Sequence, residues 1–366
     1  MKIQKPFILL LAVIAIAAAI YFLQTSQLKP LPEVEKISIT PAENLSGERQ
    51  QILLEKEAKY KKATELVQPD GYLNVENITL KELIGKKVIL IDFWTYSCIN
   101  CIRTFPYLNA WYEKYRDSGF VIIGVHTPEF EFETKYENVE KAVEKYGLKY
   151  PVVQDNNYFT WRAYRNNYWP HKYLIDIDGY IVYDHIGEGG YEETEKLIQN
   201  LLLERAGVLN EAITIDETMA KPKAVGVEFS RIRTPEIYLG YEFTRGNFGS
   251  PEGIKPDKAV FYTIPEEPKP DFVYLEGTWK NNKDNMELAS ETGRVLLVYD
   301  AKIANLVASS EEGSMLEVLL DNAPHKEIEV SSSDLYTAAS AEDYGLHTLE
   351  INVKGPGFRI YTFTFG

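Results

Sequence analysis

The two cysteines are the residues of this sequence whose type and spacing indicate chemistry most directly. Cys98 and Cys101 are the only cysteines among 366 residues, and they form a C-x-x-C motif within the stretch WTYSCINCIRTFPYL. Such a pair can be a redox couple, half of a metal site or a structural disulfide. A zinc site needs three or four ligands, but the sequence has no second C-x-x-C and no histidine pair at metal-binding spacing. A disulfide across two residues closes too short a loop to stabilise a fold much, so redox chemistry is the favoured interpretation.

The sequence around the cysteines has the pattern of a strand followed by a helix. KKVILIDFW (86–94) is a continuous apolar run typical of a buried parallel strand, and residues 98–115 have helical spacing. Cys98 would then lie at a helix N-terminus, where unpaired N–H groups and the positive end of the helix dipole stabilise a thiolate. We expect Cys98 to be the attacking sulfur and Cys101 the resolving thiol.

Two residues outside the motif fit this chemistry. Asp92 interrupts the apolar strand, and a carboxyl is costly to bury there unless it has a function. We expect it to carry the proton of Cys101, although a hydrogen-bonded strand residue is the alternative. Pro170 precedes another strand-like run, and a cis bond there would place the Trp169 backbone where a substrate strand can pair with it. A trans turn proline is the more frequent case.

His126 is a weaker candidate for substrate binding. It ends the strand-like run GFVIIGVH (119–126), and the carboxyl ends of parallel strands are where binding sites of α/β proteins form. It could act together with Glu129, but a solvated pair of loop residues is the alternative interpretation.

The N-terminus predicts an exported chain. Residues 7–23 are uncharged and follow two lysines, a pattern that predicts a transmembrane anchor, with residues 1–6 as a cytoplasmic tip and everything else outside the cytoplasm. A cleaved signal peptide, with Ala17-Ala18-Ala19 as a weak cleavage site, is the alternative. The polar residues 24–68 read as a tether.

Two folded domains are predicted after the tether. Residues 69–208 alternate strand and helix patterns, with a hairpin at 172–187, and predict an α/β domain. Residues 220–366 instead carry short strand-like runs at the spacing of a β-sandwich. Such runs are found at 236–243, 258–264, 272–280, 293–300, 315–321, 347–353 and 358–365.

The composition limits the partners and the cofactors. A net charge of −15, from 54 acidic and 39 basic residues, disfavours nucleic acid or an anionic membrane surface as the main partner. No organic cofactor is expected, because the chemistry belongs to the two sulfurs. Ile99 and Asn100 add no charge between the cysteines, which favours a reducing couple over an oxidase or isomerase.

The block TLKELIGKKVILIDFWTYSCINCIRTFPYL (79–108) resembles the active-site region of the thioredoxin superfamily, in its extracytoplasmic TlpA/ResA-like branch. Pro106 matches the proline that bends the active-site helix of that family. The resemblance implies a thioredoxin fold and a set of roles: Cys98 as nucleophile, Cys101 as resolving cysteine, Asp92 as buried acid, Trp94 packed under the site and Pro170 as cis-proline.

Longer stretches are similar to the periplasmic part of DipZ-type proteins. These are WTYSCINC (94–101), GVHTPEF (124–130), YWPHKYLID (168–176) and GEGGYEETE (187–195), and the C-terminal half resembles the appended carbohydrate-binding-module-like β-sandwich, a jelly roll. The resemblance implies a thiol:disulfide oxidoreductase whose partners are disulfide-containing client proteins. DipZ-type proteins carry their own CcdA-like electron-transfer domain, whereas this chain has one hydrophobic segment, so we expect a separate CcdA-like membrane electron donor.

Three other functions remain open at this point. A thiol peroxidase would use Cys98 with Arg103 and Thr104 as its activating residues. A binding protein would act through the β-sandwich and keep an inert disulfide. A glycan ligand would need an exposed aromatic platform, for which the candidates, better explained as core residues, are Trp279, Tyr238, Tyr241 and Phe243.

Overall fold

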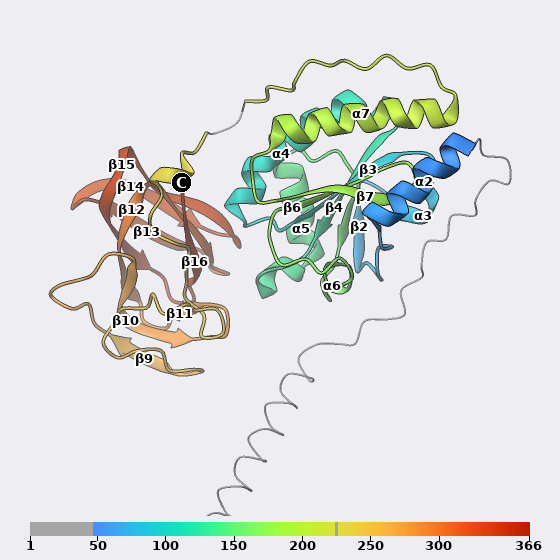
Figure 1. Ribbon diagram of the computed structural model, residues 1–366. Coiled ribbons are helices and arrows are strands. Elements are labelled where there is room, and N and C mark those ends of the chain that lie inside the picture. Colours follow the sequence, from blue (N-terminus) through green and yellow to red (C-terminus); the bar gives the residue numbers. More distant parts are fainter. Residues whose placement is uncertain (1–46, 224–225) are drawn as a thin grey trace, which may run out of the picture.

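The computed structural model describes residues 47–223 and 226–366, which form an α/β part followed by a β-rich part (Figure 1). The predicted membrane anchor at residues 7–23 lies outside these ranges. Within them, no helix combines the length and the apolar character needed to cross a bilayer.

The α/β part is built on a seven-stranded mixed sheet with the order β1-β7-β6-β3-β4-β5-β2. Strands β3, β4 and β5 are parallel, and β6 lies antiparallel to β3 on its other side. This arrangement is a thioredoxin-like fold, so the predicted fold of this part is confirmed. The strands are β1(Lys61–Lys62), β2(Gly71–Leu73), β3(Val88–Trp94), β4(Phe120–His126), β5(Val152–Gln154), β6(His171–Ile175) and β7(Tyr180–Ile186).

Helices cover both faces of this sheet, so the central strand β3 is buried along its whole length. Its side chains alternate between two apolar clusters: Leu90 and Trp94 face the cluster that includes α4, and Ile91 and Phe93 face the other. Asp92 therefore points to the same face as Trp94, toward α4. The helices are α2(Gly47–Lys59), α3(Leu80–Leu83), α4(Ile99–Tyr115), α5(Tyr136–Lys145), α6(Phe159–Ala163) and α7(Tyr191–Leu209).

The second half of the predicted tether belongs to the α/β part. Strand β1 pairs with β7, and Ala63 and Leu66 are buried in the core. Helix α2 buries no residue and docks through charge, because the Lys56 ammonium lies 2.6 Å from Asp176 and 2.8 Å from Asp178. The charged residues that suggested a solvated tether instead form ion pairs with the α/β part. The tether prediction is therefore wrong for residues 47–68.

The β-rich part is one antiparallel hydrogen-bonded network of nine strands. Strand β12 pairs with β10 through residues 294–298 and with β16 through residues 304–309. The two ends of this long strand therefore have different neighbouring strands. A β-rich C-terminal region is confirmed, whereas the sandwich or jelly-roll subtype stays a prediction. The strands are β8(Ile237–Tyr238), β9(Ala259–Tyr262), β10(Phe272–Asn281), β11(Met286–Leu288), β12(Thr292–Ser309), β13(Ser314–Leu320), β14(Ala323–Val330), β15(Asp334–Lys354) and β16(Arg359–Phe365).

Three of the four residues considered for an aromatic glycan platform pack against other side chains. Trp279 is fully buried in the core of the β-rich part. Tyr238 and Phe243 instead pack against Phe130 of the α/β part, with ring centroids 6.3 and 5.7 Å from it.

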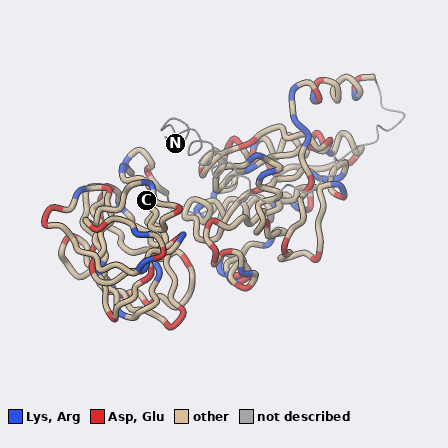
Figure 2. The backbone as a smooth tube through the Cα atoms, turned by 90° about the horizontal axis from the view of Figure 1, so that it is seen from below, with Lys and Arg blue, Asp and Glu red and all other residues tan. Residues whose placement is uncertain are grey.

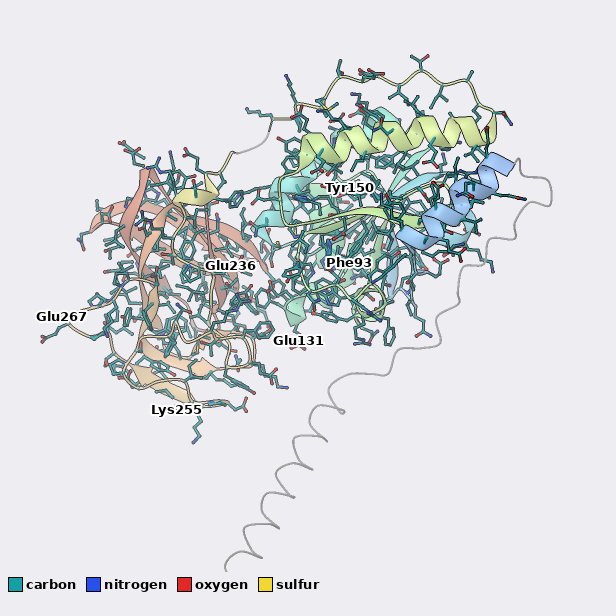
Figure 3. All side chains as sticks on the ribbon, in the orientation of Figure 1. Phe93, Glu131, Tyr150, Glu236, Lys255 and Glu267 are labelled. Carbon is teal, nitrogen blue, oxygen red and sulfur yellow. The ribbon has the colours of Figure 1, made fainter. Side chains whose placement is uncertain are left out.

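The two parts share an apolar contact. Tyr361 of β16 packs on Phe130 and Phe132, with centroids at 5.1 and 4.7 Å, and the Tyr96 hydroxyl donates to the Ser333 carbonyl at 3.1 Å. Figure 3 shows labelled side chains from each part, such as Glu131, near this boundary. Acidic and basic residues are scattered over both parts (Figure 2).

Candidate active site

Cys98 is the N-cap residue of α4 and is partly exposed, whereas Cys101 is fully buried one turn into the helix. The Cys98 sulfur accepts a hydrogen bond from the Cys101 backbone N–H at 3.3 Å, and both cysteines are free thiols. The accessible sulfur is therefore that of Cys98, and a helix N–H points at it.

The Trp169–Pro170 peptide bond is cis, as the family resemblance implied. It brings the Trp169 carbonyl oxygen to 3.9 Å from the Cys98 sulfur. The Trp169 indole is fixed by a 3.0 Å hydrogen bond to the Thr127 carbonyl and by packing on Trp161, with centroids 4.3 Å apart. The backbone beside Cys98 is thus held by a partly exposed aromatic residue.

Asp92 lies behind the two cysteines and has no exposed surface. Neither of its carboxyl oxygens has a hydrogen-bond partner among the described residues. Burial raises its pKa to about 7, and the nearby Lys172 ammonium limits the rise. A carboxyl with a pKa near neutrality can both accept and return a proton.

Lys172 was not anticipated from the sequence. It lies directly opposite Asp92 across the β3–β6 pair, is fully buried, and donates to the Gly187 carbonyl at 2.9 Å. Burial lowers the pKa of this ammonium, and Asp92 opposes that change. A lysine inside the strand run after Pro170 is the signal that could have revealed it, because a buried lysine needs a partner.

Burial raises the pKa of the Cys101 thiol well above its ordinary range, and contact with Cys98 and the charge of Asp92 raise it further. Cys101 is consequently held as a thiol. A base is required before Cys101 can act as a nucleophile.

Trp94 and His126 lie beneath the site. Both have no exposed surface, and their rings meet edge to face at 4.9 Å. Burial lowers the pKa of His126 to about 3, so its imidazole is neutral at ordinary pH. Trp94 thus packs under the site, as the family resemblance implied, whereas the burial of His126 does not agree with the predicted contact of that residue with substrate.

Glu133 holds the loop that leads to Cys98 and was also missed from the sequence. Its carboxylate accepts from the Ser97 hydroxyl at 2.6 Å and backbone N–H at 3.3 Å, and from the N–H groups of Glu129 and Phe130 at 2.6 and 2.9 Å. The residue is fully buried in a segment, EFEFET, whose charges read as solvated. No local pattern distinguishes it from its exposed neighbour Glu131.

A polar cleft opens between the two parts of the chain at Cys98. Its volume is about 330 Å³, and it takes walls from both parts. The Tyr238 hydroxyl donates to Glu129 at 2.8 Å across the cleft. Burial and the charge of Glu133 raise the pKa of Glu129 to about 8. The lining residues used below are Cys98, Ile99, Glu129, Trp169, Tyr238 and Thr364.

Replacing Tyr238 by phenylalanine should destabilise the chain by about 1 kcal/mol, because one half-buried hydrogen bond between the parts is lost. The same hydrogen bond lowers the pKa of Glu129, so that pKa should rise further in the variant. Urea unfolding measures the first effect, and carboxyl titration by NMR or infrared spectroscopy measures the second. Tyr241→Phe is the matched control, since Tyr241 contacts Asp257 within the β-rich part. An unchanged Glu129 titration would contradict the contact.

The two residues considered for peroxide chemistry are engaged elsewhere. The Arg103 guanidinium pairs with Glu188 at 3.3 Å, and the Thr104 hydroxyl donates to the Asn100 carbonyl at 3.0 Å. Neither contact is directed at the Cys98 sulfur. The site is therefore equipped for exchange between sulfurs more clearly than for attack on a peroxide.

Two protein-family models match the chain. Residues 60–184 match the AhpC/TSA family, and residues 234–366 match a family described as thioredoxin-like C-terminal domain. The match to the second model covers most of the β-rich part.

Several curated proteins are similar to the chain. Protein DipZ of Mycobacterium tuberculosis is 35% identical over 301 residues, which are 81% of this chain and 41% of DipZ. The thiol-disulfide oxidoreductase ResA of Bacillus thuringiensis is 35% identical over 129 residues, 35% of this chain and 71% of ResA. The thiol-disulfide oxidoreductase YkuV of Bacillus subtilis is 29% identical over 38% of this chain and 93% of its own. The chain thus spans about two fifths of DipZ, and the resemblance stated from the sequence is confirmed.

Proposed function

The chain belongs to the thioredoxin-like thiol-disulfide oxidoreductases that include ResA, and we propose that it reduces disulfide bonds of client proteins outside the cytoplasm. The observation that carries the proposal is the difference in exposure between the two sulfurs. Cys98 is partly exposed at a helix N-terminus, and Cys101 is buried in front of Asp92.

The proposed reaction has two steps. The Cys98 thiolate attacks one sulfur of the client disulfide, so that a Cys98–client bond forms, the client S–S bond breaks and the released client thiolate takes up a proton. Asp92 then removes the proton of Cys101, whose thiolate attacks the Cys98 sulfur. The bond between Cys98 and the client breaks, and the second client sulfur leaves as a thiolate that takes up the proton held by Asp92. The client gains two electrons and two protons, and the enzyme is left with a Cys98–Cys101 disulfide.

A separate donor must return two electrons to that disulfide. We propose a CcdA-like membrane protein for this role, together with a membrane anchor at residues 7–23 that keeps both parts on the extracytoplasmic side. The support is the run of uncharged residues after Lys2 and Lys5. No organic cofactor enters the proposed reaction, because both steps are exchanges between sulfurs.

The reduction potential of the Cys98/Cys101 couple tests the direction. We expect a value near that of thioredoxin, about −270 mV, since the intervening Ile99 and Asn100 add no charge that would stabilise the thiolate. Equilibration of the purified chain with glutathione buffers, followed by alkylation and mass measurement, gives the value. A potential near about −120 mV would identify an oxidant and overturn the proposed direction.

A further inference from the structure

A second cavity adjoins the polar cleft at the start of α4. It has a volume of about 540 Å³ and is lined mainly by apolar side chains of α4 and β12. Ile99 lines both this apolar pocket and the polar cleft that contains Cys98. The two cavities are therefore adjacent compartments on either side of one side chain next to the attacking sulfur. The lining residues used here are Ile99, Ile102, Phe105, Asn109, Ile303, Asn305 and Thr337.

Two polar atoms of residues that line the apolar pocket have no hydrogen-bond partner within residues 47–223 and 226–366. Asn109 donates through Nδ2 to the Tyr146 carbonyl at 3.2 Å, and its Oδ1 is buried and unpartnered. Asn305 accepts from the Thr337 hydroxyl at 3.0 Å through Oδ1, and its Nδ2 is buried and unpartnered. Asn305 is only 1% exposed, so water does not readily satisfy it. One acceptor and one donor thus remain, which is the complement of a peptide group.

A polar stripe connects the two cavities on the β-rich side. Asn305 lies opposite Thr337 of β15 and opposite Thr364 of β16, so the three side chains are neighbours across three adjacent strands. Thr364 lines the polar cleft, and its hydroxyl is buried without a partner among the described residues. Unsatisfied polar groups therefore follow one line from the Cys98 cleft into the apolar pocket.

We propose that the two cavities together bind one extended segment of the client polypeptide. The client cysteine lies at Cys98 in the polar cleft, an apolar side chain of the same segment fills the apolar pocket, and a client peptide group bonds to Asn109 and Asn305. The inference rests on the proposed function and adds to it a substrate class: disulfides in extended segments with an apolar residue near the cysteine. Continuity through Ile99 and the leftover donor and acceptor support this occupant.

The test compares peptide disulfides that differ in one residue. A series of peptides carries leucine or serine at each of the positions within four residues of the cysteine, and hydroxyethyl disulfide serves as a substrate without any flanking chain. With the full-length chain, kcat/KM should be about 10-fold higher for leucine than for serine at one position, as expected for an apolar side chain in an apolar pocket. Hydroxyethyl disulfide reports the sulfur chemistry alone.

Thr337→Trp fills the pocket from the β-rich part and should remove the leucine preference, with each peptide rate expressed relative to the hydroxyethyl disulfide rate of the same variant. Thr292→Trp is the matched control, since Thr292 is also exposed on a strand of that part but lines neither cavity, and it should keep the preference. Ile303→Ser provides a second variant that removes apolar lining instead of adding bulk, and it should lower the preference.

Two results would overturn the inference while the proposed function stands: equal rates for leucine and serine peptides at every position, or an undiminished preference in Thr337→Trp and Ile303→Ser. The second result would show that the leucine preference arises outside this pocket. Failure of the unmodified chain to reduce hydroxyethyl disulfide or any peptide would instead overturn the proposed function, and the role of the pocket with it.

Discussion

Replacing Cys98 by serine should lower disulfide reduction at least about 1,000-fold, because the attacking sulfur is removed and a serine hydroxyl is not ionised at neutral pH. Cys101 cannot substitute for it, since that thiol is fully buried and its pKa is raised. Insulin reduction followed by turbidity, with dithiothreitol as the electron source, measures the loss.

Cys101→Ser is the matched control for that variant. It keeps the attacking sulfur and removes the one that resolves the mixed disulfide, so it should accumulate covalent adducts with client proteins that disappear on reduction. The double variant Cys98→Ser, Cys101→Ser should form none. Non-reducing electrophoresis separates these outcomes. Adducts through Cys101 in the Cys98→Ser variant would reverse the assigned roles. An insulin-reduction rate that does not change when Cys98 is removed would mean that the cysteine pair is inert, as expected for a protein that binds through its β-rich part.

Replacing Asp92 by asparagine should stabilise the chain at pH 8 and have almost no effect at pH 3. Below pH 3.8 the carboxyl is protonated in both the folded and the unfolded chain. Between the ordinary pKa of 3.8 and the folded value of about 7, the unfolded chain loses the proton while the folded chain keeps it. Folding stability therefore falls as the pH rises through this window, by about 4 kcal/mol in total, and stays lowered above it.

The asparagine variant does not carry this cost. Because it also removes the carboxylate that faces Lys172, we expect a net gain of about 2 kcal/mol at pH 8. Urea unfolding of both proteins at pH 3, 5 and 8 measures the difference, in which titrations common to the two chains cancel. An equal gain at pH 3 and pH 8 would show that Asp92 is not the titrating group.

The same variant should slow the release of client from the mixed disulfide about 100-fold at pH 7, since the amide cannot take the proton of Cys101. Rapid-quench trapping of the mixed disulfide separates this step from the first attack, which should keep its rate. Asp155→Asn is a suitable control, because Asp155 is also a buried carboxyl with a pKa raised to about 6, but its oxygens accept from the Thr160 and Trp161 N–H groups. A similar slowing in both variants would indicate a general disturbance of the fold.

The central elements of the α/β part follow from local patterns. The run ending at Trp94 is uniformly apolar because β3 is covered on both faces, so a sequence window alone identifies it. The helix after Cys98 and the hairpin around Gly179 also follow from short sequence patterns. In the hairpin, Gly179 takes a positive φ of 83°, which glycine adopts readily. The position of Pro170 beside Cys98 came from family resemblance, because contacts across seventy residues leave no local pattern.

The parts that were missed depend on tertiary contacts. Glu133 and Lys172 are buried charges whose partners lie on other elements, and a charged residue in a sequence reads as exposed until that partner is known. Strands β12 and β15 are longer than the predicted runs, because each changes neighbours along its length and its apolar alternation shifts at bulges. The cleft between the two parts could not be predicted at all, since one wall comes from residues between 97 and 169 and the other from residues between 236 and 364.

The apolar contact between the two parts makes the packing of the redox loop depend on the β-rich part. Tyr238 and Tyr361 belong to the same buried cluster as Trp94 and Phe105, so the β-rich part supplies side chains to the interior on which the redox loop rests. A redox module cut away from this partner would expose that apolar surface to water, at a cost that grows with the area uncovered. The redox loop of this chain is therefore supported from beneath by both parts, unlike the loop of a domain joined to its neighbour by a flexible linker alone.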